Sequence, residues 1–214
     1  QWGVVGVWGQ RIPAQKPKLI VGVTVSGMMY DYLSVYWDKY GDDGFRRMAT
    51  SGANCKNARF NYLITEPSVG YASIATGANP SEHGIVSDYW YNRLTNEIAY
   101  SLDDPEQTTI GGSYGTGAYS PISMHNRTLS DEIRIKSRFR SKSIGVAIDP
   151  QASILMAGHT ATGAYWLDPI RASWVTSSYY MDSLPTWVNE FNEKNYRDLY
   201  LNRMWETLRP ISEY

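Results

Sequence analysis

A near-continuous apolar run, KLIVGVTVS, covers Lys18 to Ser26 and is rich in valine and isoleucine. Such runs are typical of central strands in parallel sheets, which are buried on both faces. Apolar residues then recur at helical spacing over 29–40, and a shorter helix is predicted over 44–51, ending at Gly52. Residues 54–62 supply a second strand. Strand, helix and strand in this order predict a βαβ unit, whose right-handed crossover builds a parallel sheet.

The rest of the chain continues to alternate strand and helix signals. Residues 86–93 and 97–101 predict a β-hairpin, and a glycine-rich loop follows over 102–124. A helix opened by Thr128 and Asp131 comes next, then a buried strand over 143–149 and a helical turn over 152–157. Two segments at 164–167 and 173–177 can pair across a turn, and Pro185 opens a last helix. We expect an α/β fold with a mainly parallel sheet flanked by helices. An irregular arm would cover residues 1–16, and one domain residues 17–214.

Composition excludes several classes of function. The formal net charge is −1, from 20 basic and 21 acidic residues, so no bulk field favours nucleic acid or an anionic membrane. No apolar run is long enough to span a bilayer. Cys55 is the single cysteine and cannot form an internal disulfide. The chain begins at Gln1 without methionine or a signal peptide, which suggests a processed or trimmed start.

The stretch from Asn61 to Ile85 carries the densest chemical signal. It predicts the end of a strand, a turn, and a small-residue helix that begins near Pro67, followed by a Gly-Ala-Asn-Pro break. A helix N-terminus presents unpaired N–H groups and the positive end of the helix dipole, so it can hold an anion. The alternative is a helix that enters behind a strand, with glycine and alanine serving close packing alone.

This stretch resembles the nucleophile region of the alkaline phosphatase superfamily, in particular its phosphate-irrepressible, PafA-like branch of Bacteroidetes. The residues that match the pattern of that branch without a gap are Asn61, Tyr62, Thr65, Gly70, Ile74, Thr76, Gly77, Pro80, His83, Gly84 and Ile85. The resemblance extends from Lys16 to about Phe191. It implies the N-terminal half of an alkaline-phosphatase-like α/β fold.

The resemblance implies that enzymes of that family use two Zn²⁺ ions, a threonine or serine nucleophile, and cationic groups that hold the transferred phosphoryl group. The positions it assigns to these roles all carry other residues here: Ser26, Pro67, Asp88, Asp149 and Gln151. The aspartate that ligates zinc is replaced by Ser26, whose neutral hydroxyl is a poor ligand. The nucleophile falls on Pro67, which has neither a hydroxyl nor an N–H.

The remaining three substitutions change charge. An asparagine is replaced by Asp88, and the lysine and arginine that grip phosphate are replaced by Asp149 and Gln151. Together they move the site by four charge units toward negative. A shifted turn that presents Thr65 or Ser68 would be needed to restore a nucleophile.

Three further positions of the family pattern are assigned no role in chemistry. The family's histidine after glycine falls on Tyr71, while His83 and His159 remain in blocks that match the family's framework. We expect both histidines to be structural imidazoles with satisfied hydrogen bonds, and assign no catalytic, cofactor-binding or metal-binding residue.

The predicted function is therefore non-enzymatic. We expect a pseudophosphatase that serves as a binding or structural component of a Gram-negative cell envelope, periplasmic or extracellular, without a bound cofactor and with a protein partner. The 17 tyrosines and 8 tryptophans offer surface for such a partner. The alternative is a zinc-dependent phosphomonoesterase or phosphodiesterase with a displaced nucleophile and further metal ligands from a missing C-terminal half, because family enzymes are much longer than this chain.

Overall fold

A computed structural model describes residues 17–201 and 203–213. The chain divides into two compact units, Gln1–Ala58 and Arg59–Tyr214. The arm predicted at 1–16 lies outside the described residues, and the single domain predicted over 17–214 stays a prediction.

The described part of the first unit contains three short helical segments. They are α1 (Tyr32–Val35), the 3₁₀ helix η1 (Trp37–Lys39) and α2 (Phe45–Ser51). The strand predicted at 18–26 is wrong for this structure, because these residues form no strand and Leu19, Val21 and Val23 are exposed. The strand predicted at 54–62 is also absent. A strand is held by hydrogen bonds to a partner, and no described residue of this unit pairs with 18–26.

The second unit contains the remaining elements. Its helices are α3 (Pro67–Thr76), α4 (Pro80–His83), α5 (Leu129–Lys136), α6 (Pro150–Ala157), α7 (Thr186–Glu193), α8 (Tyr196–Tyr200) and η2 (Ile211–Glu213). Its strands are β1 (Tyr89–Asn92), β2 (Glu97–Tyr100), β3 (Thr109–Ile110), β4 (Ile144–Val146), β5 (Gly163–Asp168) and β6 (Ser173–Ser177).

Four of these strands form a mixed sheet in the order β3-β6-β5-β4. Strands β4 and β5 are parallel and are connected through α6, whereas β6 pairs antiparallel with both β5 and β3. The α/β class is confirmed, but only one of the three pairings in the described sheet is parallel. The short turn between β5 and β6 explains the difference, because a connection of four residues permits only antiparallel pairing.

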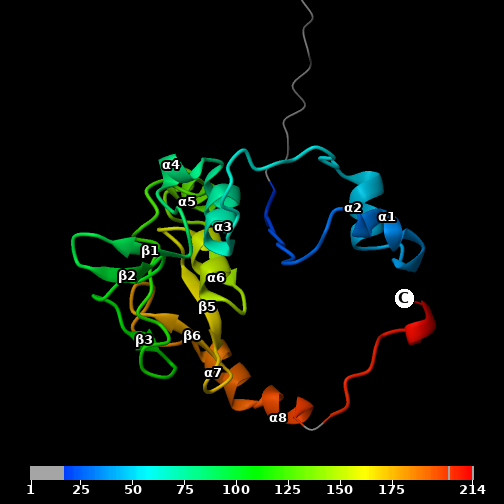
Figure 1. Cartoon of the computed structure of the whole chain (residues 1–214). Coiled ribbons are helices and arrows are strands. Elements are labelled where there is room, and N and C mark those ends of the chain that lie inside the picture. The colour runs from blue at the N-terminus through cyan, green and yellow to red at the C-terminus, as the bar shows by residue number, and fades with distance from the viewer. Residues whose placement is uncertain (1–16, 202, 214) are drawn as a thin grey trace, which may run out of the picture. The chain divides into compact units, whose positions relative to one another are not determined.

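Helices α3 and α6 lie side by side next to the sheet (Figure 1). Gly145 on β4 lets α6 approach closely, since a Cβ at this position would collide with the carbonyl oxygen of Ser153. The buried core joins these layers and consists of Val69, Ala72, Ile85, Leu102, Met124, Ile154, Leu155, Ala157, Ala164, Trp166 and Val175.

Several elements predicted from local sequence signals are confirmed in this unit. The hairpin forms between β1 and β2, with Asn96 at a φ of 58° in its turn. Helix α3 begins at Pro67, whose fixed φ suits the first helical position. Helix α5 begins after Thr128, which shares a capping box with Asp131.

Candidate functional site

The N-terminus of α3 is the place where the resemblance positions the nucleophile. Pro67 occupies the first helical position and is exposed. Glu66 precedes it, and its carboxylate accepts hydrogen bonds from the Ser87 hydroxyl and the Asp88 N–H, both at 2.6 Å. These two donors lower the pKa of Glu66. The segment around Ser87 is thereby attached to the start of the helix.

Asp88 supplies an anion to the same helix end. Its Oδ1 accepts the Ser68 N–H at 2.8 Å. This N–H belongs to the first turn of α3, where backbone donors lack intrahelical partners and the dipole favours negative charge. A first-turn N–H that could bind an anion is therefore already bonded to a carboxylate of the chain itself.

The two candidate replacement nucleophiles differ in accessibility. The Ser68 side chain is fully buried, and its hydroxyl lies 2.9 Å from the hydroxyl of Ser101, which is also buried. Thr65 is exposed in the segment before α3. Of the two hydroxyls, only that of Thr65 is open to a substrate.

The phosphate-gripping positions lie at the N-terminus of α6. Asp149 is the N-cap residue, is exposed, and forms no side-chain hydrogen bond to the helix. Gln151 follows Pro150 in the first turn and is half-buried. This helix end therefore presents one acidic and one neutral side chain, and no cation. The remaining position, Ser26, is exposed in a turn of the first unit.

His83 is a buried, neutral imidazole. The Ile85 N–H donates to His83 Nδ1 at 3.2 Å, so the proton lies on Nε2, which is 3.0 Å from Ser73 Oγ. Burial lowers the pKa of His83. Both ring nitrogens are used within the fold, as expected for a structural histidine.

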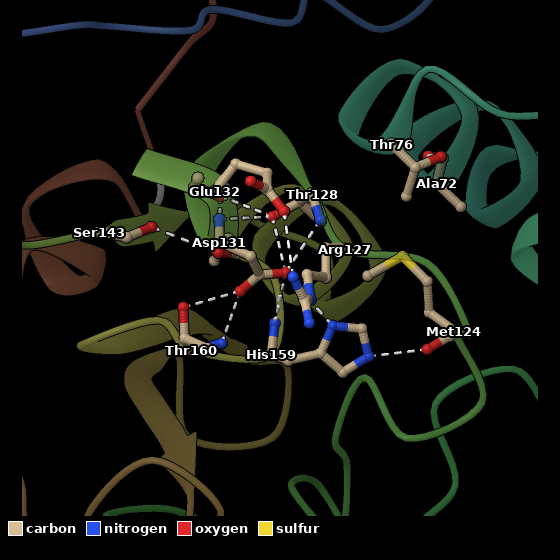
Figure 2. Close-up of polar contacts among 12 residues, drawn as sticks. Ala72, Thr76, Met124, Arg127, Thr128, Asp131, Glu132, Ser143, His159 and Thr160 are labelled. Atoms are coloured by element: carbon tan, nitrogen blue, oxygen red, sulfur yellow. Dashed lines mark hydrogen bonds and ion pairs between the residues drawn. The ribbon is translucent and has the colours of Figure 1, made fainter. Parts of the chain in front are cut away.

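Asp131 is the centre of a polar cluster (Figure 2), of which the sequence predicted only the capping box with Thr128. The carboxylate is fully buried and accepts hydrogen bonds from the backbone and hydroxyl of Thr128 and from the backbone and hydroxyl of Thr160. The backbone N–H and the Nδ1 of His159 lie 3.2 and 3.3 Å from its Oδ2. The capping box was visible in the sequence, but the approach of residues 159 and 160 was not.

His159 connects this cluster to a neighbouring loop. Its Nε2 lies 2.7 Å from the carbonyl oxygen of Met124 and must donate to it, while Nδ1 faces the Asp131 carboxylate. Both ring nitrogens face acceptors, which favours the imidazolium form. Gly158 (φ 84°) makes this approach possible, because a Cβ there would collide with Thr128 and Asp131.

The pKa shifts of this pair have definite directions. Burial opposes ionisation of Asp131, but hydrogen bonds from His159, Thr128 and Thr160 outweigh it and hold the pKa of Asp131 below its ordinary value of 3.8. The hydrogen bond to Asp131 raises the pKa of His159 above 6.5, against the opposing effect of burial. The folded state therefore favours the charged form of both groups.

Stability should consequently depend on pH. The contribution of His159 is complete below its unfolded pKa of 6.5 and is lost as pH rises through its higher folded pKa, whereas that of Asp131 is lost only as pH falls below 3.8. We expect the melting temperature to fall between pH 6 and pH 9, and to fall less in His159→Gln, which has no titrating ring. Thermal denaturation of both proteins across this range is the measurement. An equal decline in both would contradict the assignment.

A zinc site does not fit the side chains in the described ranges. No three His, Cys, Asp or Glu residues there come together in a way that could hold a metal ion. Ser26 offers a hydroxyl where a zinc enzyme of this family would have a carboxylate.

Comparison with known proteins identifies the family. The family model described as type I phosphodiesterase / nucleotide pyrophosphatase matches residues 20–213. The chain belongs to this family. The predicted membership of the alkaline phosphatase superfamily, close to PafA, is confirmed.

Curated relatives align over most of the chain. The alkaline phosphatase PafA of Elizabethkingia meningoseptica is 40% identical over 200 residues, which are 93% of this chain and 37% of the relative. The alkaline phosphatase PhoV of Synechococcus elongatus is 38% identical over 199 residues, which are 93% of this chain and 36% of the relative. This chain thus spans little more than a third of the length of these relatives.

The fold agrees with a solved structure. The crystal structure of wild-type PafA matches with a TM-score of 0.84 and 38% identity, covering 87% of this chain and 36% of that chain. None of the helices in the described ranges has the length and apolar character needed to cross a membrane.

Proposed function

We propose that this chain is a catalytically inactive member of its family, a pseudophosphatase that acts as a binding or structural component of the bacterial cell envelope. The observation that carries the proposal is at the start of α3. The position of the nucleophile holds Pro67, and the neighbouring Ser68 N–H is bonded to the Asp88 carboxylate. Pro67 provides no attacking oxygen, and the Ser68 N–H is not free to bind an anion.

A second PafA crystal structure supports the choice of positions. It is the structure of a variant in which a threonine, an asparagine, a lysine and an arginine are replaced. The threonine and asparagine of PafA are as far apart in sequence as Pro67 and Asp88, and its lysine and arginine are separated by one residue, as are Asp149 and Gln151. The same four positions are among those at which this chain lacks the family's groups.

Electrostatics favour the loss of phosphate binding over its retention. A charge-assisted hydrogen bond contributes about 1.5–3 kcal/mol in net terms. The lysine and arginine would each provide such bonds, whereas Asp149 repels an anion and Gln151 provides only neutral donors. Since Asp88 adds a second carboxylate, the site would oppose a phosphoryl group rather than stabilise it.

A second candidate rests on Thr65. Its exposed hydroxyl lies just before α3, and the relatives named above are phosphatases. In this alternative the chain is a zinc-dependent phosphohydrolase that uses Thr65 as a displaced nucleophile and metal ligands from a further polypeptide segment.

The resemblance supports a proposed location, and exposed aromatic side chains support a proposed partner. We place the protein in the periplasm or outside a Gram-negative cell, which fractionation against a periplasmic marker tests. A protein partner is supported by exposed aromatic side chains such as Tyr89, Tyr91 and Trp187, because aromatic residues are enriched in interface cores.

Turnover and metal content separate the two candidates. We expect the protein isolated from its native source, together with any further segment that the second candidate requires, to give no hydrolysis of p-nitrophenyl phosphate or bis-p-nitrophenyl phosphate above a heat-treated blank, and substoichiometric zinc in metal analysis. PafA from Elizabethkingia meningoseptica, assayed in parallel, is the positive control. Turnover that disappears in Thr65→Val would refute the proposal and establish the alternative. Stoichiometric zinc that is lost in Ser26→Ala would also count against it.

A further inference from the structure

The end of α5 and the loop that follows it carry a local excess of positive charge. Residues 134–142 have the sequence RIKSRFRSK, with five basic side chains in nine positions. No aspartate or glutamate occurs between Glu132 and Asp149, so this segment, which we call the basic loop, has a formal charge of +5, whereas the whole chain has −1. The small net charge of the chain hides this concentration of cations.

Contacts within the second unit fix the shape of the basic loop. Ser137 Oγ lies 2.7 Å from Ser141 Oγ. The Arg134 guanidinium donates to the Ser141 carbonyl oxygen at 2.6 Å and to the Thr162 hydroxyl at 2.8 Å. The Phe139 N–H donates to the Arg134 carbonyl oxygen at 2.8 Å. These bonds close the loop at the C-terminus of α5, so its basic side chains are held near one another.

Most of these cations have no counter-charge in the second unit. The basic residues other than Arg134 are exposed: Lys136, Arg138, Arg140 and Lys142. No ion pair joins them to a carboxylate in the described part of this unit, and the adjacent Glu132 pairs with Arg127. The helix dipole favours cations in the last turn of α5, but not in the residues beyond it. Because covering unpaired charges is costly, a surface that contacts this loop must itself be anionic.

Phe139 lies between two arginines in an unusual backbone conformation. Arg138 and Phe139 follow the helix with φ of 56° and 59°, where glycine or asparagine is favoured. The strain is not repaid by burial, since Phe139 is 58% exposed and its ring contacts the Arg134 guanidinium at 5.7 Å. Strained residues that packing does not explain are often found at functional sites. An exposed ring among cations is typical of side chains that enter the headgroup region of a membrane.

We propose that the basic loop binds an anionic lipid surface. Lys136, Arg138, Arg140 and Lys142 contact phosphodiester headgroups, and Phe139 inserts at the boundary of the acyl chains. Clusters of about four to eight basic residues are typical of sites for anionic lipids. The choice of lipid over another polyanion rests on the cell-envelope location proposed above, but not on the absence of catalysis. Vesicle binding in vitro and cell fractionation test the two proposals separately.

Co-sedimentation with vesicles tests the proposal on the protein made in its native host, with any further segment present. We expect binding to equal parts of phosphatidylcholine and phosphatidylglycerol, no binding to phosphatidylcholine alone, and release by salt. Arg138→Gln, Arg140→Gln, Lys142→Gln should weaken binding about a hundredfold, because each basic residue near the lipid surface contributes. Phe139→Asn should weaken binding about tenfold, because asparagine tolerates the positive φ but removes the ring.

A charge-matched variant separates the loop from net charge. Arg93→Gln, Arg171→Gln, Lys194→Gln removes the same charge at exposed positions outside the loop and should bind vesicles like the unmodified protein. Melting curves check that each variant is folded. Equal losses in the two triple variants would overturn the proposal, as would full binding by the folded loop variant.

Two competitors exclude other anionic partners. Sodium phosphate should release the protein no better than sodium chloride of equal ionic strength. A stronger effect of phosphate would show a site for a single phosphate group and would overturn the proposal. Tighter binding to polyglutamate or to single-stranded DNA than to the vesicles would also overturn it, in favour of an acidic protein or a nucleic acid.

Discussion

Replacement of Asp131 by alanine should lower the free energy of unfolding by about 3–5 kcal/mol, the range found when one partner of a buried ion pair is removed. The carboxylate is fully buried and accepts bonds from Thr128, His159 and Thr160. Its loss leaves these donors unsatisfied and removes the counter-charge of the His159 imidazolium. In a chain of this size the melting temperature should fall by about 6–20 °C.

Glu132 provides the matched control. It is the next residue on α5 and forms an ion pair with Arg127, in which both side chains are accessible to solvent. Exposed pairs contribute about 0–1 kcal/mol, so Glu132→Ala should leave the melting temperature nearly unchanged. Asp131→Asn should fall between the two, because it keeps an acceptor but removes the charge. Equal melting temperatures for Asp131→Ala and Glu132→Ala would show that the cluster does not stabilise the fold.

The elements that the sequence predicted correctly in the second unit depend on local signals. Pro67 sets its own φ, Thr128 and Asp131 cap each other within one turn, and the β1–β2 hairpin closes across a few residues. The strand at 18–26 failed because its apolar pattern specifies burial and not a partner. Pairing depends on residues far away in the sequence, which composition and periodicity do not identify.

The candidate site likewise has features that the sequence predicted and features that it did not. The resemblance located Pro67, Asp88, Asp149 and Gln151 by position, because the alignment has dense matches around them. It did not predict that Asp88 would accept the Ser68 N–H or that Glu66 would hold residues 87 and 88. These contacts join residues about twenty positions apart and arise only when the loop after α4 returns to the start of α3.

The Asp88 carboxylate at the start of α3 should also oppose phosphate binding, and its removal should have the second large effect. The triple variant Asp88→Asn, Asp149→Lys, Gln151→Arg should bind phosphate or vanadate at millimolar concentration, whereas the unmodified chain should not. The substitutions move the local charge by four units toward positive and supply two cationic side chains. At about 1.5–3 kcal/mol for each new charge-assisted bond, two such bonds amount to about 10²–10⁴-fold in Kd. Isothermal titration at low ionic strength measures this gain directly.

Added positive charge alone could attract anions, so a charge-matched variant is needed as a control. Asp182→Asn, Glu190→Lys, Glu193→Gln makes the same change of four units at exposed positions in and near α7. It should bind phosphate no better than the unmodified chain, because the substitutions lie outside the first turns of α3 and α6, and both of its α7 substitutions are in the last turn of that helix, at the negative end of the dipole. A further variant that adds Pro67→Thr to the first triple should bind more tightly still, since threonine restores a backbone donor and a hydroxyl at the first position of α3. If the unmodified chain already bound phosphate with millimolar affinity, the Asp88 carboxylate would not exclude anions. If both triple variants gained phosphate affinity equally, the gain would be due to net charge and not to the N-termini of α3 and α6.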